Sequence, residues 1–389
     1  MMLSLCFWIL ALFVLYVYAG YPIAVTLLAS LRPKPGASAA PAAFPSVTVL
    51  IPAHNEEKVI GGKLGNTLAL DYPSDHFQII VAADGSDDGT VDIVKTYADR
   101  GVELSYHPTR EGRMAAINRA LPLARGDIIV LSNVRCMCYR TALRELVAPF
   151  RHHLVGIVSG THRITRDEDA SSAAEATCWK YESFLWKQEA RFGCCTGVSN
   201  EILAVRRNLF EQPPDNVVYD GFFMAMQIVR RGYNMDYAPN AFSVERGPDS
   251  MQEERARRAK QIAGRYQAAA LAAETVSWRR PVVAWEVVSH HFLRLFAPFA
   301  AIGVFLASLL TVVFPSQTGH GGLLLLASPF NWIAFAPQVV FYAWALIGNS
   351  FQNRSPSYKA LYFPSYLVKN GLSVLIGVCR SLAGKSPSL

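Results

Sequence analysis

The stretch Ser46-Val-Thr-Val-Leu-Ile51, followed directly by Pro52-Ala-His-Asn-Glu-Glu57, decides the fold. A short run of β-formers that ends in a polar cluster predicts a strand that opens a domain. The elements expected after it are a helix to about Ala69, a strand at Phe77–Ala82, a helix to about Arg100 and a strand near Val102–Tyr106. Alternating strands and helices are typical of α/β proteins with a parallel sheet, whose ligands bind at the carboxyl ends of the strands.

Charge is unevenly distributed on either side of this domain. Of the 389 residues, 51% are hydrophobic and 17% are charged, whereas an average domain has about 25% charged residues. Residues 1–31 and 295–353 contain no Asp, Glu, Lys or Arg, so 62 of the 67 charged residues lie within 32–294. The pattern predicts a soluble domain between membrane segments. It excludes a fully soluble protein, a disordered chain and a bundle of spans with small loops.

Three segments are long and apolar enough to cross a membrane. Leu3–Leu28 exceeds the roughly 20 residues that a span needs, and we interpret it as an uncleaved anchor because a signal peptide normally begins with basic residues. Leu295–Phe314 and Leu323–Ile347 are expected to form a membrane hairpin, because the turn-rich stretch 315–322 separates them.

Basic residues indicate the orientation. If the N-terminus points outward, one side of the membrane holds Arg32, Lys34, Arg279, Arg280, Arg294, Arg354 and Lys359. The positive-inside rule then places the soluble domain in the cytoplasm of a bacterial-type cell, attached to the inner membrane by several spans. Leu361–Cys379 is an interfacial or re-entrant helix or a fourth span, although a fourth span would put Arg380 and Lys385 outside.

The expected domains follow from these patterns. They are an anchor at 1–31, a Pro- and Ala-rich linker at 32–45, the soluble domain at 46–250, amphipathic interfacial helices at 251–294, the hairpin at 295–347, and a loop, apolar segment and tail at 348–389. The net charge of +7 divides into −2, +4 and +5 over residues 32–250, 251–294 and 295–389. Because the excess lies beside the membrane, it favours anionic lipids as partners and removes the reason to expect nucleic acid.

The cysteines show no metal-binding motif. Cys136 and Cys138 are one residue apart, Cys194 and Cys195 are adjacent, and no Cys-x-x-Cys pair occurs. The sequence therefore argues against a zinc site, and free thiols fit a reducing compartment.

The cluster Asp84-Gly-Ser-Asp-Asp-Gly-Thr90 has two interpretations. Such a loop supplies a cap for the next helix, which explains one or two of the acidic residues. A carboxylate at a strand end, such as Asp84, can also accept hydrogen bonds from a base or ribose. The polar residues Asn55 and Glu56 at the neighbouring strand end favour nucleotide binding.

These segments resemble a known family. The motifs are Val47-Thr-Val-Leu-Ile-Pro-Ala-His-Asn-Glu-Glu57, Val81-Ala-Ala-Asp-Gly-Ser-Asp-Asp-Gly-Thr90, Glu111-Gly-Arg-Met-Ala-Ala-Ile-Asn118, Val158-Ser-Gly160, Gly197-Val-Ser199, Gly232-Tyr233 and Tyr237-Ala-Pro239. Together they resemble the glycosyltransferase family 2 domain of membrane-anchored polysaccharide synthases related to cellulose and hyaluronan synthases, over about residues 40–380. The resemblance implies a Rossmann-like GT-A fold and a hexosyltransferase. Such an enzyme moves a hexose by inverting displacement from a nucleoside diphosphate sugar to a polysaccharide or lipid-linked glycan.

The resemblance also implies the residues of the donor site. Arg113 stands where the family usually has lysine, and arginine binds phosphate well. The expected nucleotide-sugar contacts are Pro52, Ala53, Asn55, Glu56, Asp84, Ser86, Arg113, Asn133 and Arg135.

The metal position departs from the family pattern. Family members place Asp-x-Asp or Asp-Ala-Asn after the strand Ile128–Ser132, and that motif holds Mg²⁺ or Mn²⁺, whereas this chain has Asn133-Val-Arg135. Asn133 is a weak ligand for a hard cation and Arg135 repels one. Either Arg135 neutralises the diphosphate in place of a metal, or the site is impaired or weak for metal, which is the interpretation that the sequence favours.

Family members also place an acidic pair, Glu-Asp or Asp-Asp, about 11 or 12 residues before a Gly-Tyr, and the pair supplies the general base. In this chain the pair is incomplete. Asp220 lies 12 residues before Gly232-Tyr233 and matches the first member of the pair, while Gly221 stands at the second. We expect Asp220 to be the catalytic base, and a helix cap before Phe222–Arg231 is the alternative.

The stretch Gln261-Ile-Ala-Gly-Arg-Tyr266 is similar to the Gln-x-x-Arg-Trp motif of processive synthases. The resemblance implies that Gln261, Arg265 and Tyr266 contact the acceptor and the diphosphate. An amphipathic helix held by lipid headgroups is the alternative. The departures at Asn133, Arg135 and Gly221 keep a second function open, namely a catalytically impaired structural or regulatory subunit of a polysaccharide-synthesis complex.

Overall fold

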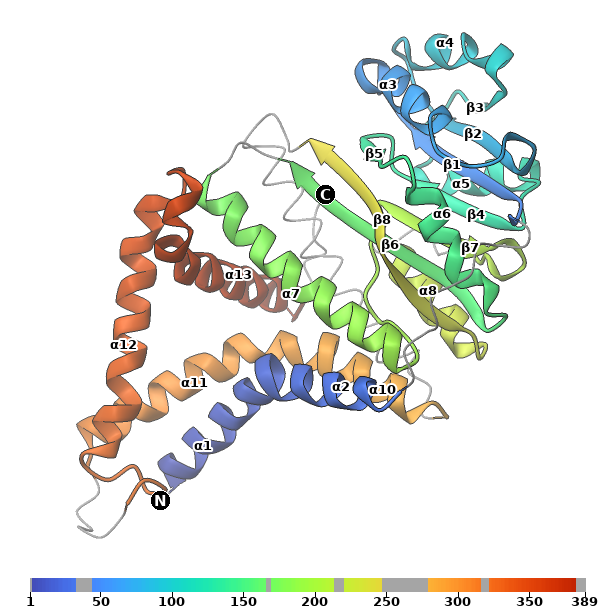
Figure 1. Ribbon diagram of the computed structural model, residues 1–389. Coiled ribbons are helices and arrows are strands. Elements are labelled where there is room, and N and C mark those ends of the chain that lie inside the picture. Colours follow the sequence, from blue (N-terminus) through green and yellow to red (C-terminus); the bar gives the residue numbers. More distant parts are fainter. Residues whose placement is uncertain are drawn as a thin grey trace.

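The computed structural model describes residues 2–32, 44–165, 169–212, 220–246, 279–315 and 322–382. Figure 1 shows two parts: a sheet domain at one end and a group of long helices at the other. The long helix α7 (Ala170–Phe192) lies between them.

The domain is built on one eight-stranded sheet with the order β3-β2-β1-β4-β7-β6-β8-β5. The strands are β1 Val47–Ala53, β2 Phe77–Asp84, β3 Val102–His107, β4 Ile128–Ser132, β5 Cys136–Cys138, β6 Val155–Thr165, β7 Ile202–Arg206 and β8 Asn234–Arg246. The expected parallel sheet is confirmed for β1 to β4. The rest of the sheet is mixed, because β7 runs antiparallel to both β4 and β6 and β5 antiparallel to β8, while β6 runs parallel to β8.

Helices cover both faces of this sheet. One face packs against α5, α8 and the end of α7, through Met114, Ile117, Phe222 and Trp186. The other packs against α3, α4 and α6, through Ile60, Leu64, Val94 and Leu146. The bounds are α3 Glu57–Leu68, α4 Thr90–Lys95, α5 Arg113–Ala120, α6 Ala142–Val147 and α8 Asp220–Arg230. Burial on both faces explains why the central strands are nearly continuous apolar runs.

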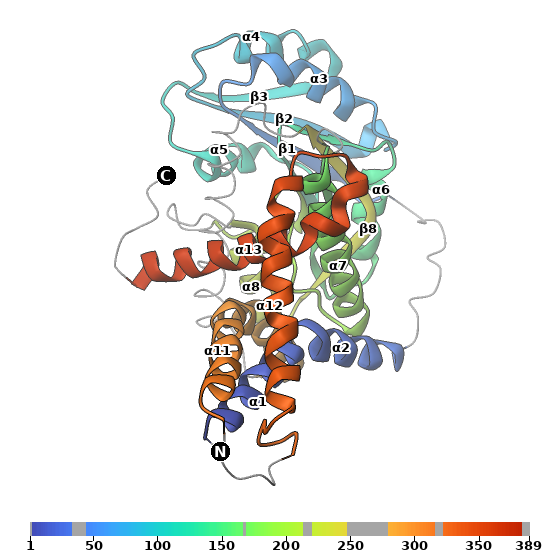
Figure 2. The ribbon, with the colours of Figure 1, turned by 90° about the vertical axis from the view of Figure 1, so that its left-hand side faces the viewer.

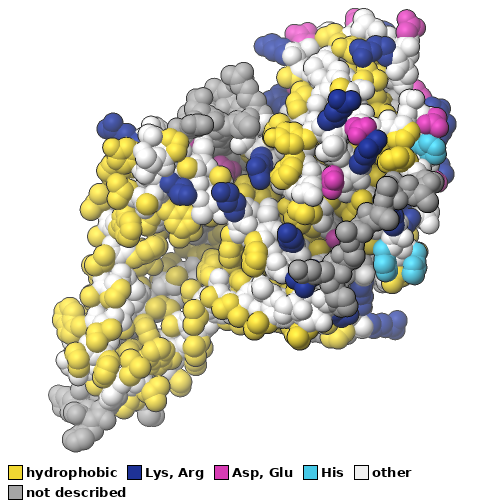
Figure 3. Space-filling view, viewed as in Figure 1, with side chains coloured by type: hydrophobic (Ala, Val, Ile, Leu, Met, Phe, Trp, Pro, Cys, Tyr) yellow, Lys and Arg dark blue, Asp and Glu magenta, His cyan; other side chains and the backbone are white. Residues whose placement is uncertain are grey.

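Three helices in the described part of the chain are long and apolar enough to cross a membrane: Met2–Ser30, Pro281–Val313 and Phe330–Phe351. They comprise α1 (Met2–Leu15), α2 (Tyr21–Ser30), α10 (Pro281–Val287), α11 (Leu293–Val313) and α12 (Phe330–Gly348). Helix α1 lies beside α11 in both ribbon views (Figures 1 and 2). Hydrophobic side chains gather over these helices, whereas charged side chains gather over the sheet domain (Figure 3).

The boundaries of two predicted segments need correction. The span expected from Leu323 begins at Phe330, because residues 322–326 form turns and Pro329 lies at the helix start. Within the predicted interfacial segment 251–294, residues 251–278 lie outside the described residues. Residues 281–292 form a helix continuous with α11.

The apolar segment Leu361–Cys379, for which the sequence allowed an interfacial helix, a re-entrant helix or a fourth span, lies within helix α13 (Lys359–Leu382). It packs against α12 and against α7 (Figure 1). The amine of Lys369 donates to Gln352 Oε1 at 2.6 Å. Helix α13 is not among the three candidate spans of the described chain.

Candidate functional site

The carboxyl ends of β1, β2 and β4 meet at one edge of the sheet, because these strands are parallel and in register. Asn55, just after β1, has a φ of 51°. Its side chain exchanges two hydrogen bonds with Asp87, and its backbone amide donates to Ser86 Oγ. Asn55 and Ser86, which are both predicted to bind the nucleotide sugar, are therefore brought together from two strand ends.

Asp84, the last residue of β2, holds the next loop. Its Oδ2 accepts the backbone amides of Glu111 at 2.9 Å and Gly112 at 2.6 Å, and its Oδ1 accepts from the guanidinium of Arg119. Burial raises the pKa of this carboxyl, but the two amides and the guanidinium outweigh burial and hold the pKa below its ordinary value. Asp84 is therefore an ionised anchor for the loop that leads to Arg113.

Asp88 binds the first residues of two helices. Its Oδ1 accepts the amide and the hydroxyl of Thr90, where α4 begins, and its Oδ2 accepts the amide of Glu57, where α3 begins. The N-cap residue of α4 is Gly89, so no acidic side chain of the cluster occupies that position. The acidic loop is thus divided, because Asp88 holds helix starts while Asp84 faces the loop at the strand ends.

Asp220 lies buried at the start of α8, and three donors surround it. Arg113 donates to Oδ2, while Asn200 Nδ2, at 2.7 Å, and the amide of Gly221, at 2.9 Å, donate to Oδ1. A helix cap accepts amides two or three residues further on, so the adjacent Gly221 amide is not that arrangement. The structure therefore brings the predicted base and the predicted diphosphate ligand into direct contact.

The missing second carboxylate has a steric explanation. A Cβ at Gly221 would lie 2.2 Å from Asn200 Oδ1 and 2.9 Å from Val198 Cγ1. Asn200 Oδ1 also accepts the amide of Gly221. The side chain of Asn200 thus occupies the space into which a side chain at position 221 would extend.

Asn133 and Arg135 form a different arrangement from a metal site. The Nε of Arg135 donates to both carboxylate oxygens of Glu56, at 3.0 and 3.2 Å, and Asn133 Oδ1 accepts the amide of Arg135. A hard divalent cation takes several oxygen ligands, usually with carboxylates among them. One neutral amide oxygen beside a guanidinium does not fit Mg²⁺ or Mn²⁺.

Other predicted residues are placed less centrally or not at all. Pro52 and Ala53 form the end of β1, with Ala53 buried. Gln261, Arg265 and Tyr266 lie outside the described residues. Sequence reasoning missed Arg119 and Asn200. Asn200 directly follows the Gly197-Val-Ser199 motif, which is the signal that could have found it.

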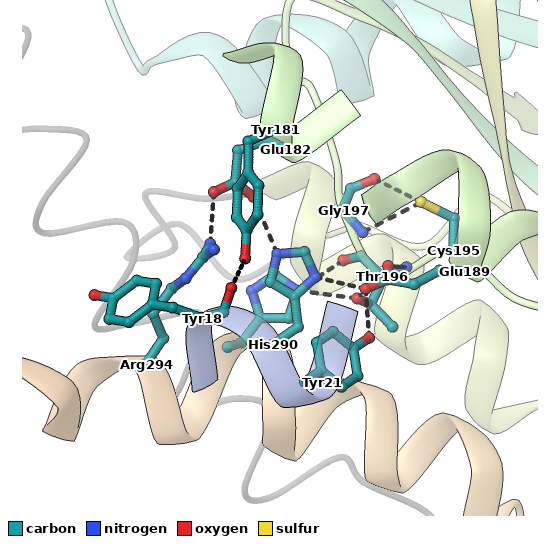
Figure 4. A network of polar contacts seen from close by, with 11 residues as sticks. Tyr18, Tyr21, Tyr181, Glu182, Glu189, Cys195, Thr196, Gly197, His290 and Arg294 are labelled. Atoms are coloured by element: carbon teal, nitrogen blue, oxygen red, sulfur yellow. Dashed lines mark hydrogen bonds and ion pairs between the residues drawn. The ribbon is translucent and has the colours of Figure 1, made fainter. Parts of the chain in front are cut away.

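A second polar network lies where the sheet domain meets the long apolar helices (Figure 4). Its centre is Glu189 on α7, which is fully buried. Oε1 lies 2.6 Å from the hydroxyl of Tyr21 and 2.6 Å from His290 Nδ1, while Oε2 accepts the amide and hydroxyl of Thr196. Burial raises the pKa of Glu189, but the neighbouring His290 outweighs burial and keeps it below its ordinary value.

The network continues through the other nitrogen of the His290 ring, which lies 3.0 Å from Glu182 Oε2. Glu182 Oε1 accepts from Arg294 at 2.5 Å, and the ring of Tyr181 packs against that guanidinium. With a carboxylate against each ring nitrogen, His290 donates twice and is cationic. The network thereby joins α2, α7, α11, the helical segment Val288–Phe292 before α11 and the loop after α7.

Comparisons with known proteins agree with this fold. Residues 48–212 match the family model described as glycosyl transferase family 2. The probable glycosyltransferase YdaM of Bacillus subtilis is 27% identical over 222 residues, which cover 53% of this chain and 52% of that protein. A beta-monoglucosyldiacylglycerol synthase of Trichormus variabilis is 29% identical over 119 residues, covering 30% of this chain and 25% of that protein. The chain thus spans about half of the first relative and less of the second.

A solved structure matches almost the whole chain. The mannosyltransferase PcManGT from Pyrobaculum calidifontis, solved with GDP-Man and Mn²⁺, superposes with a TM-score of 0.72 at 22% identity, covering 99% of this chain and 100% of that one. This likeness shows a shared fold, and the expected GT-A-like architecture with flanking apolar helices is confirmed.

Proposed function

We propose that this chain is a membrane glycosyltransferase, because residues 48–212 match the glycosyl transferase family 2 model and the fold is GT-A-like. It transfers a hexose from a nucleoside diphosphate sugar to a polysaccharide or lipid-linked glycan. The observation that carries the proposal is the short loop Glu111-Gly-Arg113. Its first two amides bind Asp84, and its arginine binds Asp220, so the expected nucleotide residue and the expected base belong to one site.

The donor binds along the strand ends in this proposal. Asn55, Glu56 and Asp84 face the nucleoside, and the guanidinium groups of Arg113 and Arg135 face the diphosphate. Arginine suits this role because its planar fork binds phosphate oxygens in pairs. The two arginines supply the positive charge that a divalent cation supplies in relatives with carboxylates at positions 133 and 135.

The reaction is one inverting displacement. The acceptor hydroxyl oxygen forms a bond to the anomeric carbon on the face opposite the diphosphate, and the bond from that carbon to the diphosphate oxygen breaks. The hydroxyl proton passes to Asp220, and the leaving electron pair stays on the diphosphate, where the arginines stabilise it.

Donor binding also prepares the base. In the structure, one carboxylate oxygen of Asp220 is occupied by Arg113. When the diphosphate attracts Arg113, this oxygen becomes available for the acceptor proton, while Asn200 continues to hold the other oxygen. The proposal therefore requires that the donor bind before the acceptor.

The membrane part supports an acceptor that is made or held at a membrane. Three apolar helices flank the domain, and one relative is named for a glycolipid, beta-monoglucosyldiacylglycerol. The distribution of basic residues supports a cytoplasmic domain on the inner membrane.

The full chain, purified in detergent, is given labelled UDP- and GDP-hexoses with membrane lipid extract, in Mg²⁺, Mn²⁺ or EDTA. We expect transfer or slow donor hydrolysis with at least one donor, and less than a threefold loss in EDTA. A strict requirement for Mg²⁺ or Mn²⁺ would contradict the role of Arg135.

A second candidate function is a structural or regulatory subunit that retains nucleotide binding. The occupied space at Gly221 favours it, because the chain cannot present the usual second carboxylate there. Donor binding without turnover of any sugar nucleotide would establish this alternative and exclude the enzyme.

A further inference from the structure

Three metal-ligating side chains meet on one face of the sheet, away from the loop that joins Asp84 to Asp220. Cys136 on β5 is the register partner of Glu245 on β8, and His162 on β6 is the register partner of Ser243 on β8. Because register partners and alternate residues share a face, Cys136, His162 and Glu245 all project to the same side.

The separations between the three side chains are those of a coordination site. Cys136 Sγ lies 3.8 Å from Glu245 Oε2, and His162 Nε2 lies 3.4 Å from the same oxygen. One ligand atom from each residue lies within 4.8 Å of the other two. Ligands on a tetrahedral zinc ion are about 3.3–3.6 Å apart, given bond lengths of about 2.0–2.3 Å.

We propose that Cys136, His162 and Glu245 bind a zinc ion. A thiolate, an imidazole and a carboxylate form a mixed set that suits zinc, while Mg²⁺ and Ca²⁺ take oxygen ligands. The thiol proton of Cys136 passes to solvent as the sulfur–zinc bond forms. Three protein ligands leave a fourth position for a water molecule.

The surroundings of the cluster support this role. Cys136 and His162 are buried, whereas the side chain of Glu245 is 22% exposed and lies on the solvent side of the group. Ser243 Oγ lies 3.2 Å from His162 Nδ1, which leaves Nε2 as the nitrogen for the ion. A hydrogen bond to the second ring nitrogen is the usual device that orients a zinc-binding histidine.

Lys63 on α3 holds strand β5 in place. Its buried amine donates to the backbone oxygen of Cys136 at 2.6 Å and to Ser132 Oγ at 2.7 Å. The backbone of β5 is therefore fixed before any ion binds. A preformed site needs less reorganisation on binding than one assembled by the metal.

The ion would stabilise the edge of the sheet next to the donor site. Strand β5 has only three residues and pairs with β8, so its own backbone bonds are few. It directly follows Arg135, which we place at the diphosphate. A zinc ion that joins β5 to β6 and β8 would hold this turn at its working position.

The test uses the full chain in detergent, stripped with a chelator and with no nucleotide sugar present. Zinc is titrated against a chromophoric competitor, and Co²⁺ is added separately as a spectroscopic probe. We expect one zinc per chain at submicromolar affinity and a near-ultraviolet thiolate-to-cobalt absorption band. Wild-type protein that binds no stoichiometric zinc, or Co²⁺ without this band, overturns the proposal.

Two variants and one matched control sharpen the result. Cys136→Ser should abolish the cobalt band, and His162→Ala should weaken zinc binding at least tenfold. Cys138→Ser, two residues along the same strand and outside the cluster, should keep both. Equal zinc binding by wild type and Cys136→Ser, or loss of the band in Cys138→Ser, would also overturn the proposal. Because no sugar transfer is measured, failure here leaves the proposed function untouched.

Discussion

Two buried carboxylates illustrate different uses of the same group. Asp220 at the strand ends and Glu189 at the membrane junction are both buried, and both accept several hydrogen bonds. The cation at Asp220 is Arg113, whose side chain is 30% exposed, whereas the cation at Glu189 is His290, whose side chain is 2% exposed.

The two sites differ in whether the cationic partner can move away from the carboxylate. An incoming diphosphate can reach Arg113 and draw it away from Asp220, because that guanidinium borders solvent. No anion reaches His290 without separating the helices that enclose it. Asp220 is therefore suited to chemistry and Glu189 to joining parts of the molecule. The predictions below test that contrast.

The largest effect is expected from Asp220→Asn, which keeps the shape of the side chain but removes the base. Turnover should fall by about 10²–10⁴-fold, the usual contribution of general base catalysis. Thermal unfolding in detergent should change little. Asp127→Asn, at the opposite end of β4, is the control and should keep full activity. Survival of activity in Asp220→Asn would show that another group takes the proton.

For Glu189→Gln we expect a loss of stability, whereas Asp220→Asn is expected to lose turnover. The new amide group places a donor against the donors of His290 or Thr196, so the free energy of unfolding should fall by about 3–5 kcal/mol. Chemical or thermal unfolding in detergent measures it. Glu182→Gln, at a partly exposed position of the same network, should cost less. If both variants unfold like wild type, the junction does not hold the parts together.

Gly221→Asp introduces the second carboxylate of the family pattern, yet it should lower activity and not raise it. Its side chain meets Asn200 and Val198, so we expect a loss of about 1–3 kcal/mol in stability from overpacking and a lower turnover. Gly221→Ala should show the same direction of change without the charge. Higher turnover in Gly221→Asp would mean that Asn200 moves aside.

A smaller effect is expected from Arg113→Lys. Lysine keeps the charge but loses the second donor, which in the structure reaches the backbone oxygen of Asn200. We expect about a tenfold loss in kcat/KM for the donor, close to 1.4 kcal/mol. Steady-state kinetics with varied donor measures it. Arg125→Lys, on the exposed edge, is the control, and equal kinetics in both variants would remove Arg113 from the donor site.

The smallest effect is a pH dependence from Asp84. Because its folded pKa is below the ordinary value, Asp84 contributes stability that is fully present above the unfolded pKa of about 4 and is lost as pH falls through the folded pKa. The Tm difference between wild type and Asp84→Asn should therefore be constant at pH 5–7 and shrink below pH 4. If the Tm difference grew on acidification, the pKa of Asp84 would be raised in the folded protein and not lowered.

The polar strand ends could be predicted because their signal is local. A β run followed at once by a polar cluster marks a strand end, and Asn55, Asp84 and Arg113 follow from that pattern and from the family resemblance. The direction of β7 and the role of Asn200 could not be predicted. They depend on pairings between segments separated by long stretches of chain.

Sequence by itself determined the division of the chain into an apolar frame and a charged α/β domain, because composition and short-range periodicity record which surfaces face lipid, core or water. Tertiary structure alone decided which side chains meet. His290 lies 101 residues from Glu189, and Glu245 lies 109 residues from Cys136. Such contacts leave no local pattern, since they arise only when the sheet and the helices have packed.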